Sequence, residues 1–253
     1  MMSKELFNTI VVGWIILAFL LFPVILKIPA PYGRHSRNDW GPLVNNRLGW
    51  FIMESPALFA FAYFVLKGGG YQQIVIFSFF LLWVIHYLNR AIIFPLRIKT
   101  RGKKMPLVIL AFAFIFNLVN GFINGYWFGS LSPGYSPDWF FNIRFILGVL
   151  IFIAGFMINQ YHDRILIGLR KEGAGGYRIP YGGLFKFVSC PNFLGEIIQW
   201  GGFAIMTWCL PALSFFVWTM VNLIPRSLDH HKWYLKEFQT YPQSRKAVFP
   251  YLL

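Results

Sequence analysis

Residues 7–26 read FNTIVVGWIILAFLLFPVIL, and this segment decides the class of protein to which the chain belongs. A helix needs about 20 mostly apolar residues to cross the hydrocarbon core of a bilayer, and this stretch has that length and character. No small-residue cleavage site follows it, so we interpret it as a membrane span rather than a signal peptide. Similar segments recur along the chain and predict an all-α, polytopic integral membrane protein.

The composition of the whole chain also indicates a membrane protein. Of its 253 residues, 57% are hydrophobic and only 13% are charged, whereas a soluble domain carries about 25% charged residues. Aromatic residues make up 20%, and Trp and Tyr concentrate at the two interfaces of a bilayer. The net charge of +14 fits basic cytoplasmic loops and an anionic cofactor better than nucleic acid. Cys190 and Cys209 form no CxxC pair and predict no disulfide framework.

Six further apolar stretches follow the first, and we predict seven membrane-spanning helices in a single domain. The stretch 193–224 is too long for one span. Pro211 removes a helix hydrogen bond and clashes with the preceding turn, so we divide the stretch there. The predicted spans are residues 7–26, 50–66, 73–96, 107–128, 139–169, 193–209 and 211–234.

Basic residues alternate between the loops that these spans define. The loops after the first, third and fifth spans and the tail after the seventh are rich in Lys and Arg. The loops after the second, fourth and sixth spans hold only Lys67 between them. Because cytoplasmic loops carry the excess of Lys and Arg, we expect the N-terminus outside and the C-terminus in the cytoplasm.

Ionisable side chains lie inside the second and third predicted spans, at a depth where charge is costly. Glu54 stands in the first turns of the second span. His86, Tyr87 and Arg90 lie well inside the third, and Tyr87 and Arg90 share one helix face because they are three residues apart. Arg90 keeps its proton and requires an anion nearby. Glu54 or Asp163 could supply it, either as a structural ion pair or as part of a functional site.

Polar residues at helical spacing mark the last three predicted spans near their cytoplasmic ends. We interpret these stripes as the lining of one polar cavity that binds a nucleotide. Guanidinium groups would bind phosphates, amides and carboxylates would bind hydroxyls, and a tyrosine would stack. Hydrogen bonding between the helices of the bundle is the alternative. The stripes consist of Asn159, Asp163 and Arg170, then Asn192 and Glu196, and finally Arg226, His230 and Tyr234.

Other nucleotide and metal motifs are missing from the sequence. The glycine-rich segment 173–178 lacks the final glycine of the dinucleotide fingerprint and follows no predicted strand. The chain has no P-loop and no serine in a nucleophile elbow. His230 and His231 point about 100° apart on a helix, and no third ligand stands at metal spacing. We therefore expect no metal site, and a dinucleotide would have to be held by helices.

Several long segments resemble the steroid 5-alpha-reductase family. They cover most of the chain and are densest after Asn159. These segments are 32–35 (YGRH), 50–54 (WFIME), 86–87 (HY), 169–173 (LRKEG), 177–185 (YRIPYGGLF), 192–198 (NFLGEII), 230–236 (HHKWYLK) and 241–247 (YPQSRKA).

The resemblance implies a seven-helix enzyme that uses NADPH to reduce the 4,5 double bond of a 3-oxo-4-ene steroid. It implies a substrate chamber mainly in the first four spans and an NADPH cavity mainly in the last three. By this likeness Glu54 and Tyr87 hold the substrate ketone, and Trp50 and Arg90 are further pocket positions. Met53 stands where the family often has Gln, which removes one hydrogen-bonding group. The implied cofactor contacts are Asn159, Asp163, Arg170, Tyr177, Asn192, Glu196, Arg226, His230 and Tyr234.

The expected reaction places negative charge on the ketone oxygen as hydride adds to C5, the far end of the conjugated system. A donor on that oxygen stabilises the transition state more than the ground state. Tyr87 can donate its phenolic proton. Glu54 donates when it is protonated and orients Tyr87 when it is ionised. The nicotinamide carries the hydride, while the protein supplies position and electrostatics.

Other classes of protein fit parts of the sequence. A membrane methyltransferase that uses S-adenosylmethionine also holds its cofactor among C-terminal helices, but it does not need the Glu54 and Tyr87 pair. A retinal-binding receptor would need a lysine in the last span, and residues 213–224 contain none. A reductase of a polyprenol, an enoyl-CoA or another lipid enone is a further alternative.

The expected setting follows from the same reasoning. We expect a monomer surrounded by membrane lipid, with a lipophilic, steroid-like substrate and no nucleic acid or metal as a partner. The membrane would be the inner membrane of a bacterium or the endoplasmic reticulum of a eukaryote.

Overall fold

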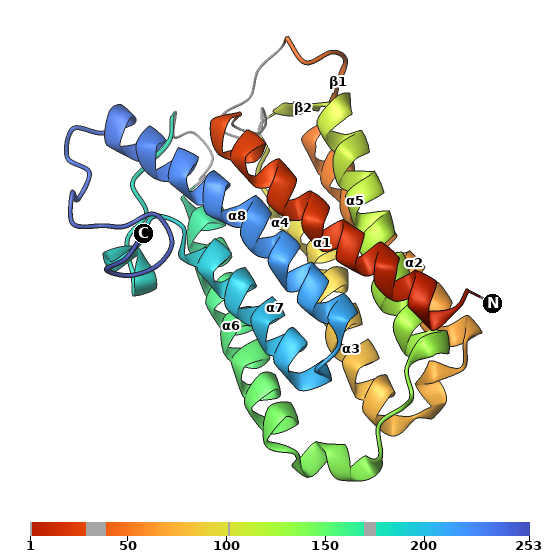
Figure 1. The fold of residues 1–253 in the computed structure, drawn as a ribbon. Coiled ribbons are helices and arrows are strands. Elements are labelled where there is room, and N and C mark those ends of the chain that lie inside the picture. Colours follow the sequence, from red (N-terminus) through yellow and green to blue (C-terminus); the bar gives the residue numbers. More distant parts are fainter. Residues whose placement is uncertain (1, 29–38, 101, 170–175) are drawn as a thin grey trace. The chain divides into compact units, whose positions relative to one another are not determined.

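The protein is mostly α-helical in a computed structural model that describes residues 2–28, 39–100, 102–169 and 176–253. Figure 1 shows the course of the chain through its helices. The α-helices are α1 (Lys4–Lys27), α2 (Asn46–Lys67), α3 (Ile74–Leu88), α4 (Phe94–Arg97), α5 (Leu107–Tyr126), α6 (Ile143–Gly168), α7 (Pro191–Thr207) and α8 (Leu210–Glu237).

The described residues are mostly α-helical, as predicted, and a short antiparallel ribbon is added to the helices. Strand β1 (Leu43–Asn45) pairs with β2 (Lys104–Pro106). Each strand has three residues, which is too short for an alternating pattern to appear in the sequence. The ribbon joins the loop before α2 to the segment before α5.

Helices occupy all seven segments for which spans were predicted, with shifts of a few residues at their ends. Among the described residues, five helical segments are long and apolar enough to cross a membrane, namely 4–27, 46–67, 74–97, 107–131 and 143–168. Helix α7 has only 17 residues, and α8 ends in a polar segment. The seven-span count and the orientation therefore stay predictions.

One shift at a helix start occurs in α2, which begins at Asn46 rather than at residue 50. Asn45 causes it, because its side-chain oxygen accepts hydrogen bonds from the amides of Arg47 and Leu48 and caps the helix. The long stretch 193–224 holds two helices, since α7 ends at Thr207 and α8 begins at Leu210. The break lies at residues 208–209, and Pro211 stands in the first turn of α8.

The third predicted span is not a regular α-helix throughout. Residues Asn89–Ile93 form a π-helical turn between α3 and α4, in which the Phe94 amide donates to the Asn89 carbonyl. Pro95 follows in α4. Proline lacks an amide proton and clashes with the preceding turn, and the wider π turn accommodates it. Arg90 belongs to this turn.

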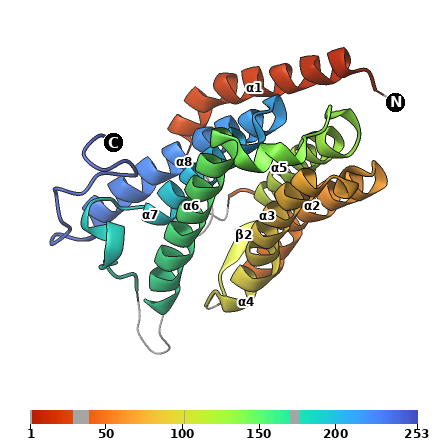
Figure 2. The ribbon, with the colours of Figure 1, turned by 90° about the horizontal axis from the view of Figure 1, so that it is seen from below.

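The chain divides into two compact units. The first contains α2, α3, α4 and α5, and the second contains α7 with most of α6 and α8. In the first unit α2 lies beside α3 and α5 (Figure 2). A Cβ atom added at Gly125 of α5 would lie 2.8 Å from both Cα and O of Phe61 on α2. The absence of a side chain therefore lets the two backbones approach closely.

In the second unit α6 and α7 pack through glycines spaced seven residues apart on each helix. A Cβ at Gly155 would lie 2.5 Å from Gly195 O, and one at Gly202 would lie 2.7 Å from Gly148 O. The pairs run in opposite directions along the two helices, so the helices are antiparallel. This glycine contact brings the polar ends of α6 and α7 together.

Candidate functional site

The first cluster of predicted site residues lies in the first unit, where α2 meets the π turn. Arg90 Nε is 3.8 Å from Glu54 Oε1, and the two side chains are 11% and 14% exposed. The Arg90 guanidinium also lies over Trp50, 4.8 Å from the ring centroid. Glu54 therefore supplies the anion that Arg90 requires in an apolar span, and three predicted residues are in contact.

An asparagine that was not predicted from the sequence completes this cluster. Asn117 Nδ2 on α5 donates to Glu54 Oε2 at 3.3 Å and to Met53 O at 2.6 Å. Because both partners are acceptors, they fix which way the amide points. The side chain of Met53 packs in an apolar cluster with Met105 and Leu110. Asn117 is thus the group that supplies an amide to Glu54.

Tyr87 lies on α3 and is 3% exposed. Trp83, one turn earlier, donates its Nε1–H to Ala57 O on α2 at 3.0 Å. One turn later, the guanidinium of the π turn contacts Trp50. Tyr87 lies between these two contacts on α3, and Glu54 lies between them on α2. The two residues are therefore at the same level along the antiparallel helices.

The second cluster lies in the second unit, at the facing ends of α6 and α7. Asn159 Nδ2 donates to Asn192 O at 3.0 Å, and Asn192 Nδ2 donates to Asp163 Oδ1 at 2.9 Å. All three side chains are buried. A Cβ at Gly195 would lie 2.5 Å from Asn159 N, so the glycine contact sets the helix separation at this point. Two of the three predicted stripes meet here, and their hydrogen bonds also join the helices.

The third stripe, on α8, reaches the same end of α7 through Phe193. Arg226 Cζ lies 5.5 Å from the centroid of the Phe193 ring, and the ring of His230 stacks on it at 5.6 Å. Phe193 directly follows Asn192. The stripe on α8 is therefore next to the hydrogen-bonded stripes of α6 and α7.

The aromatic positions predicted for the cofactor site are linked by ring contacts. Tyr177 packs edge-on against Trp233 at 4.9 Å between centroids, and Trp233 contacts Tyr234 at 5.3 Å. Glu196 is half-buried on α7, one turn beyond the stripe residue at its start. Arg170 lies outside the described residues.

A histidine that was also not predicted anchors the loop after α6. The Leu184 amide donates to His162 Nε2 at 2.9 Å, and His162 Nδ1 is 2.7 Å from Ile158 O. Since Nε2 accepts, Nδ1 carries the proton and the imidazole is neutral. Gly183 adopts a φ of 51°, and a Cβ there would lie 2.6 Å from His162 Nε2. Gly183 of the YRIPYGGLF segment is thus required by this anchor.

The donor types of the second cluster suit a phosphorylated dinucleotide. Arg226 offers a guanidinium for phosphate, the buried amides and carboxylate match hydroxyl and carboxamide groups, and the tyrosines offer stacking faces. Within the described residues, no group of three or more His, Cys, Asp or Glu side chains could hold a metal ion.

Comparison with known proteins identifies the family. A family model described as 3-oxo-5-alpha-steroid 4-dehydrogenase matches residues 103–253. The chain is 43% identical to steroid 5-alpha-reductase DET2 of Solanum lycopersicum, over 99% of this chain and 98% of that protein. This chain belongs to the 3-oxo-5-alpha-steroid 4-dehydrogenase family.

Animal members of the 3-oxo-5-alpha-steroid 4-dehydrogenase family are similar over nearly the same length. Identity to 3-oxo-5-alpha-steroid 4-dehydrogenase 1 of Mus musculus is 36%, over 94% of this chain and 93% of that protein. Identity to 3-oxo-5-alpha-steroid 4-dehydrogenase 2 of Sus scrofa is 39%, over 88% of each chain. The resemblance inferred from the sequence is confirmed. The family model covers the whole second cluster, and the long alignments extend the likeness toward the N-terminus.

Proposed function

We propose that this member of the family reduces the 4,5 double bond of a 3-oxo-4-ene steroid with NADPH. The names of its relatives support the steroid and the reaction. The observation that carries the proposal is the buried Glu54–Arg90 pair, joined by Asn117 at the level of Tyr87. It provides donor groups for a ketone oxygen in a bundle whose apolar helices suit a lipid-soluble substrate.

In the substrate site we assign Tyr87 as the donor to the C3 oxygen. Both oxygens of Glu54 already face donors, one from Arg90 and one from Asn117, so we assign Glu54 to orient Tyr87 and the ketone. A fixed donor in a water-poor site stabilises the developing oxyanion more than a mobile solvent molecule does. The enolate that forms then takes a proton at C4 from water.

In the cofactor site we propose that the three stripes bind NADPH. When bound, NADPH supplies the hydride that adds to C5. Arg226 would bind a phosphate, and the Asn192–Asp163 pair would bind hydroxyl or carboxamide groups. The proposed contacts are Asn159, Asp163, Arg170, Tyr177, Asn192, Glu196, Arg226, His230 and Tyr234.

The membrane setting is part of the proposal. Seven spans would place the N-terminus outside and the basic loops and C-terminal tail in the cytoplasm, where NADPH is available. We propose a monomer in a bacterial inner membrane or an endoplasmic reticulum membrane, according to the source organism.

The decisive experiment is turnover by purified protein in lipid nanodiscs, followed as loss of the nicotinamide absorbance band of NADPH. We expect turnover with a 3-oxo-4-ene steroid and none with a polyprenol or an enoyl-CoA. Product analysis should show a saturated 3-oxo steroid. Binding of S-adenosylmethionine without NADPH consumption would contradict the proposal.

Asn117→Leu should lower kcat/KM for the steroid by about tenfold, which is the cost of one hydrogen bond to a charged group. The substitution keeps the size of the side chain but removes the donor to Glu54 Oε2 and Met53 O. Steady-state kinetics at saturating NADPH measure the effect. Asn124→Leu is the matched control. Asn124 also carries a buried amide on α5, but this amide donates to the backbone oxygen of Asn120 within the same helix. Equal effects of both substitutions would contradict a specific role for Asn117.

Asn192→Asp should raise the Kd for NADPH by about tenfold or more. The new carboxylate would face Asp163 Oδ1, which now accepts a 2.9 Å hydrogen bond, so a donor is lost and like charges meet. Titration of NADPH fluorescence measures the Kd. Gln72→Glu makes the same change of amide to carboxylate at an exposed position of the first unit and should leave the Kd unchanged. A wild-type Kd for Asn192→Asp would remove this pair from the cofactor site.

A further inference from the structure

A buried hydrogen-bonded network outside the proposed cofactor contacts joins three segments of the second unit. Ser189 Oγ lies 2.6 Å from the Tyr241 hydroxyl and 2.7 Å from His231 Nδ1. Ser189 precedes α7, His231 lies on α8, and Tyr241 lies in the tail after α8. Ser189 is 3% exposed and Tyr241 is 2% exposed. One serine hydroxyl therefore connects the beginning of α7 to two later parts of the chain.

The chemistry of the three groups allows one continuous chain of hydrogen bonds. A serine hydroxyl can donate one proton and accept others. Burial raises the pKa of Tyr241 above its ordinary value of 10.0, although the hydrogen bond with Ser189 acts in the opposite direction. Tyr241 is therefore a neutral phenol that can donate to Ser189, and Ser189 can donate to His231 Nδ1.

Each member of the network adjoins a residue that we propose to contact NADPH. Ser189 stands three residues before Asn192. His231 directly follows a proposed contact on α8. The ring of Tyr241 stacks on Tyr234 with 5.0 Å between centroids and an interplanar angle of 6°. A shift of any network member would therefore move one side of the proposed cofactor site.

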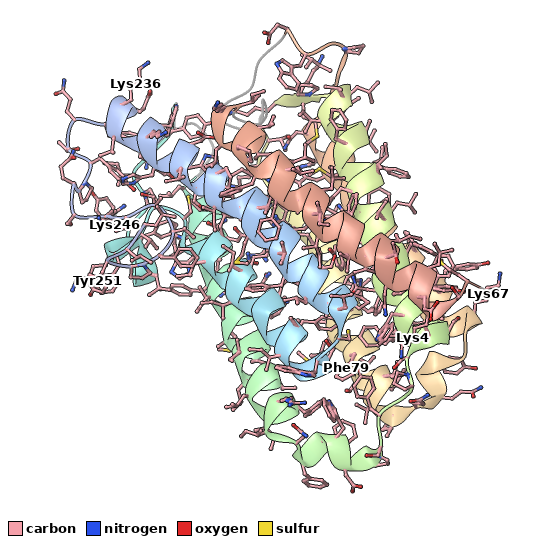
Figure 3. All side chains as sticks on the ribbon, viewed as in Figure 1. Lys4, Lys67, Phe79, Lys236, Lys246 and Tyr251 are labelled. Atoms are coloured by element: carbon pink, nitrogen blue, oxygen red, sulfur yellow. The ribbon has the colours of Figure 1, made fainter. Side chains whose placement is uncertain are left out.

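The backbone of the tail reinforces the same connection. We call residues 241–247 the tail strap, and Figure 3 labels Lys246 on it. The Ser189 amide donates to Lys246 O at 2.8 Å. The Arg245 guanidinium lies over the Tyr241 ring at 5.1 Å, and its Nη1 donates to Pro180 O at 3.0 Å. The tail strap is thus fastened to the loop before α7 at several points.

We propose that Ser189, His231 and Tyr241 form a positioning network that sets the affinity for NADPH by holding the start of α7 against the end of α8. The inference rests on the proposed function, because it assumes that Asn192 and Tyr234 contact the cofactor. The network acts through these residues and has no part in polarising the ketone. It should therefore influence cofactor binding and leave the steroid step unchanged.

The test compares Ser189→Ala, Tyr241→Phe and the double variant by NADPH titration and by steady-state kinetics. Each single substitution should raise the Kd for NADPH by about fivefold to tenfold, the effect of one lost hydrogen bond. The double variant should bind NADPH as tightly as the weaker-binding single variant does, because both substitutions break the same chain of hydrogen bonds. At saturating NADPH, kcat should stay within about twofold of the wild-type value.

Ser227→Ala is the matched control. Ser227 is also a buried serine of the second unit, but its hydroxyl donates to Leu223 O within α8 at 2.6 Å. This variant should keep the wild-type Kd. If Ser189→Ala fails to fold, the Kd of Tyr241→Phe alone tests the network, since this variant keeps the ring that stacks on Tyr234.

The outcomes separate the network from the proposed function. A wild-type protein that binds NADPH, with network variants that bind it equally well, would overturn the network and leave the function intact. A fall in kcat at constant Kd in these variants would likewise overturn the network alone. A wild-type protein that binds no NADPH would overturn both proposals.

Discussion

Tyr87→Phe is expected to lower kcat for a 3-oxo-4-ene steroid by about 10²–10³-fold, the usual cost of removing a donor from a developing oxyanion. The side chain is 3% exposed, so water has little room to replace the lost hydroxyl. Phenylalanine keeps the ring contact with Trp83, whose centroid is 5.2 Å away, and the fold should persist. Single-turnover consumption of NADPH measures the rate, and titration should give a wild-type Kd for NADPH.

Glu54→Gln should act in the same direction, because it removes the carboxylate that pairs with Arg90 and that we propose orients Tyr87. The amide has nearly the same size, so the comparison isolates charge. Tyr63→Phe is the control for loss of a tyrosine hydroxyl, since Tyr63 is 53% exposed on α2, and it should turn over at the wild-type rate. Full turnover in both Tyr87→Phe and Glu54→Gln would refute the roles assigned to these residues.

Gly195→Val is expected to abolish recovery of folded protein that binds NADPH. A Cβ at Gly195 would lie 2.5 Å from Asn159 N and 2.7 Å from Gly155 O. These are backbone atoms, so α6 and α7 would have to separate, and the Asn159–Asn192 hydrogen bond would be lost. Overpacking usually costs about 1–3 kcal/mol. Here the blocking atoms cannot move aside, so the cost should approach the total stability of about 5–15 kcal/mol.

The loss of stability and of NADPH binding should increase with the size of the side chain added at Gly195. Gly195→Ala should lower the Tm and weaken NADPH binding less severely than Gly195→Val, as measured by thermal unfolding and by titration. Gly13→Ala is the control, because a Cβ there meets no atom within 4 Å and alanine favours a helix by about 1 kcal/mol. An unchanged Tm and Kd in Gly195→Ala would show that the glycine contact does not set the helix separation.

The helices could be predicted because an apolar run of bilayer length is a strong signal within a single segment. Helix α5 begins at Leu107 as predicted. The ribbon of β1 and β2 and the π turn could not be predicted, since each depends on backbone geometry over three to five residues. Pro95 was a signal for an irregular turn, but it did not specify which kind.

The candidate sites were only partly predictable for a related reason. Arg90 in an apolar span demands an anion, but spacing along one helix does not choose between Glu54 and Asp163. Asn117 was missed because an uncharged amide in a span usually has a structural role, hydrogen bonding between helices. Its recurrence with Asn120 and Asn124 on one face of α5 was the available signal, since all three are buried.

The tail strap has a consequence for the order of biosynthesis. Ser189 and its partner Tyr241 are 52 positions apart, and Pro180 and Arg245 are 65 apart. At a translation rate of about 5–20 residues per second, the loop before α7 is made about 3–13 s before its fastening. During that interval the nascent chain already carries the polar ends of α6 and α7 without the segment that secures them. Docking of the tail strap onto the loop before α7 is thus a late, long-range step in the folding of the second unit.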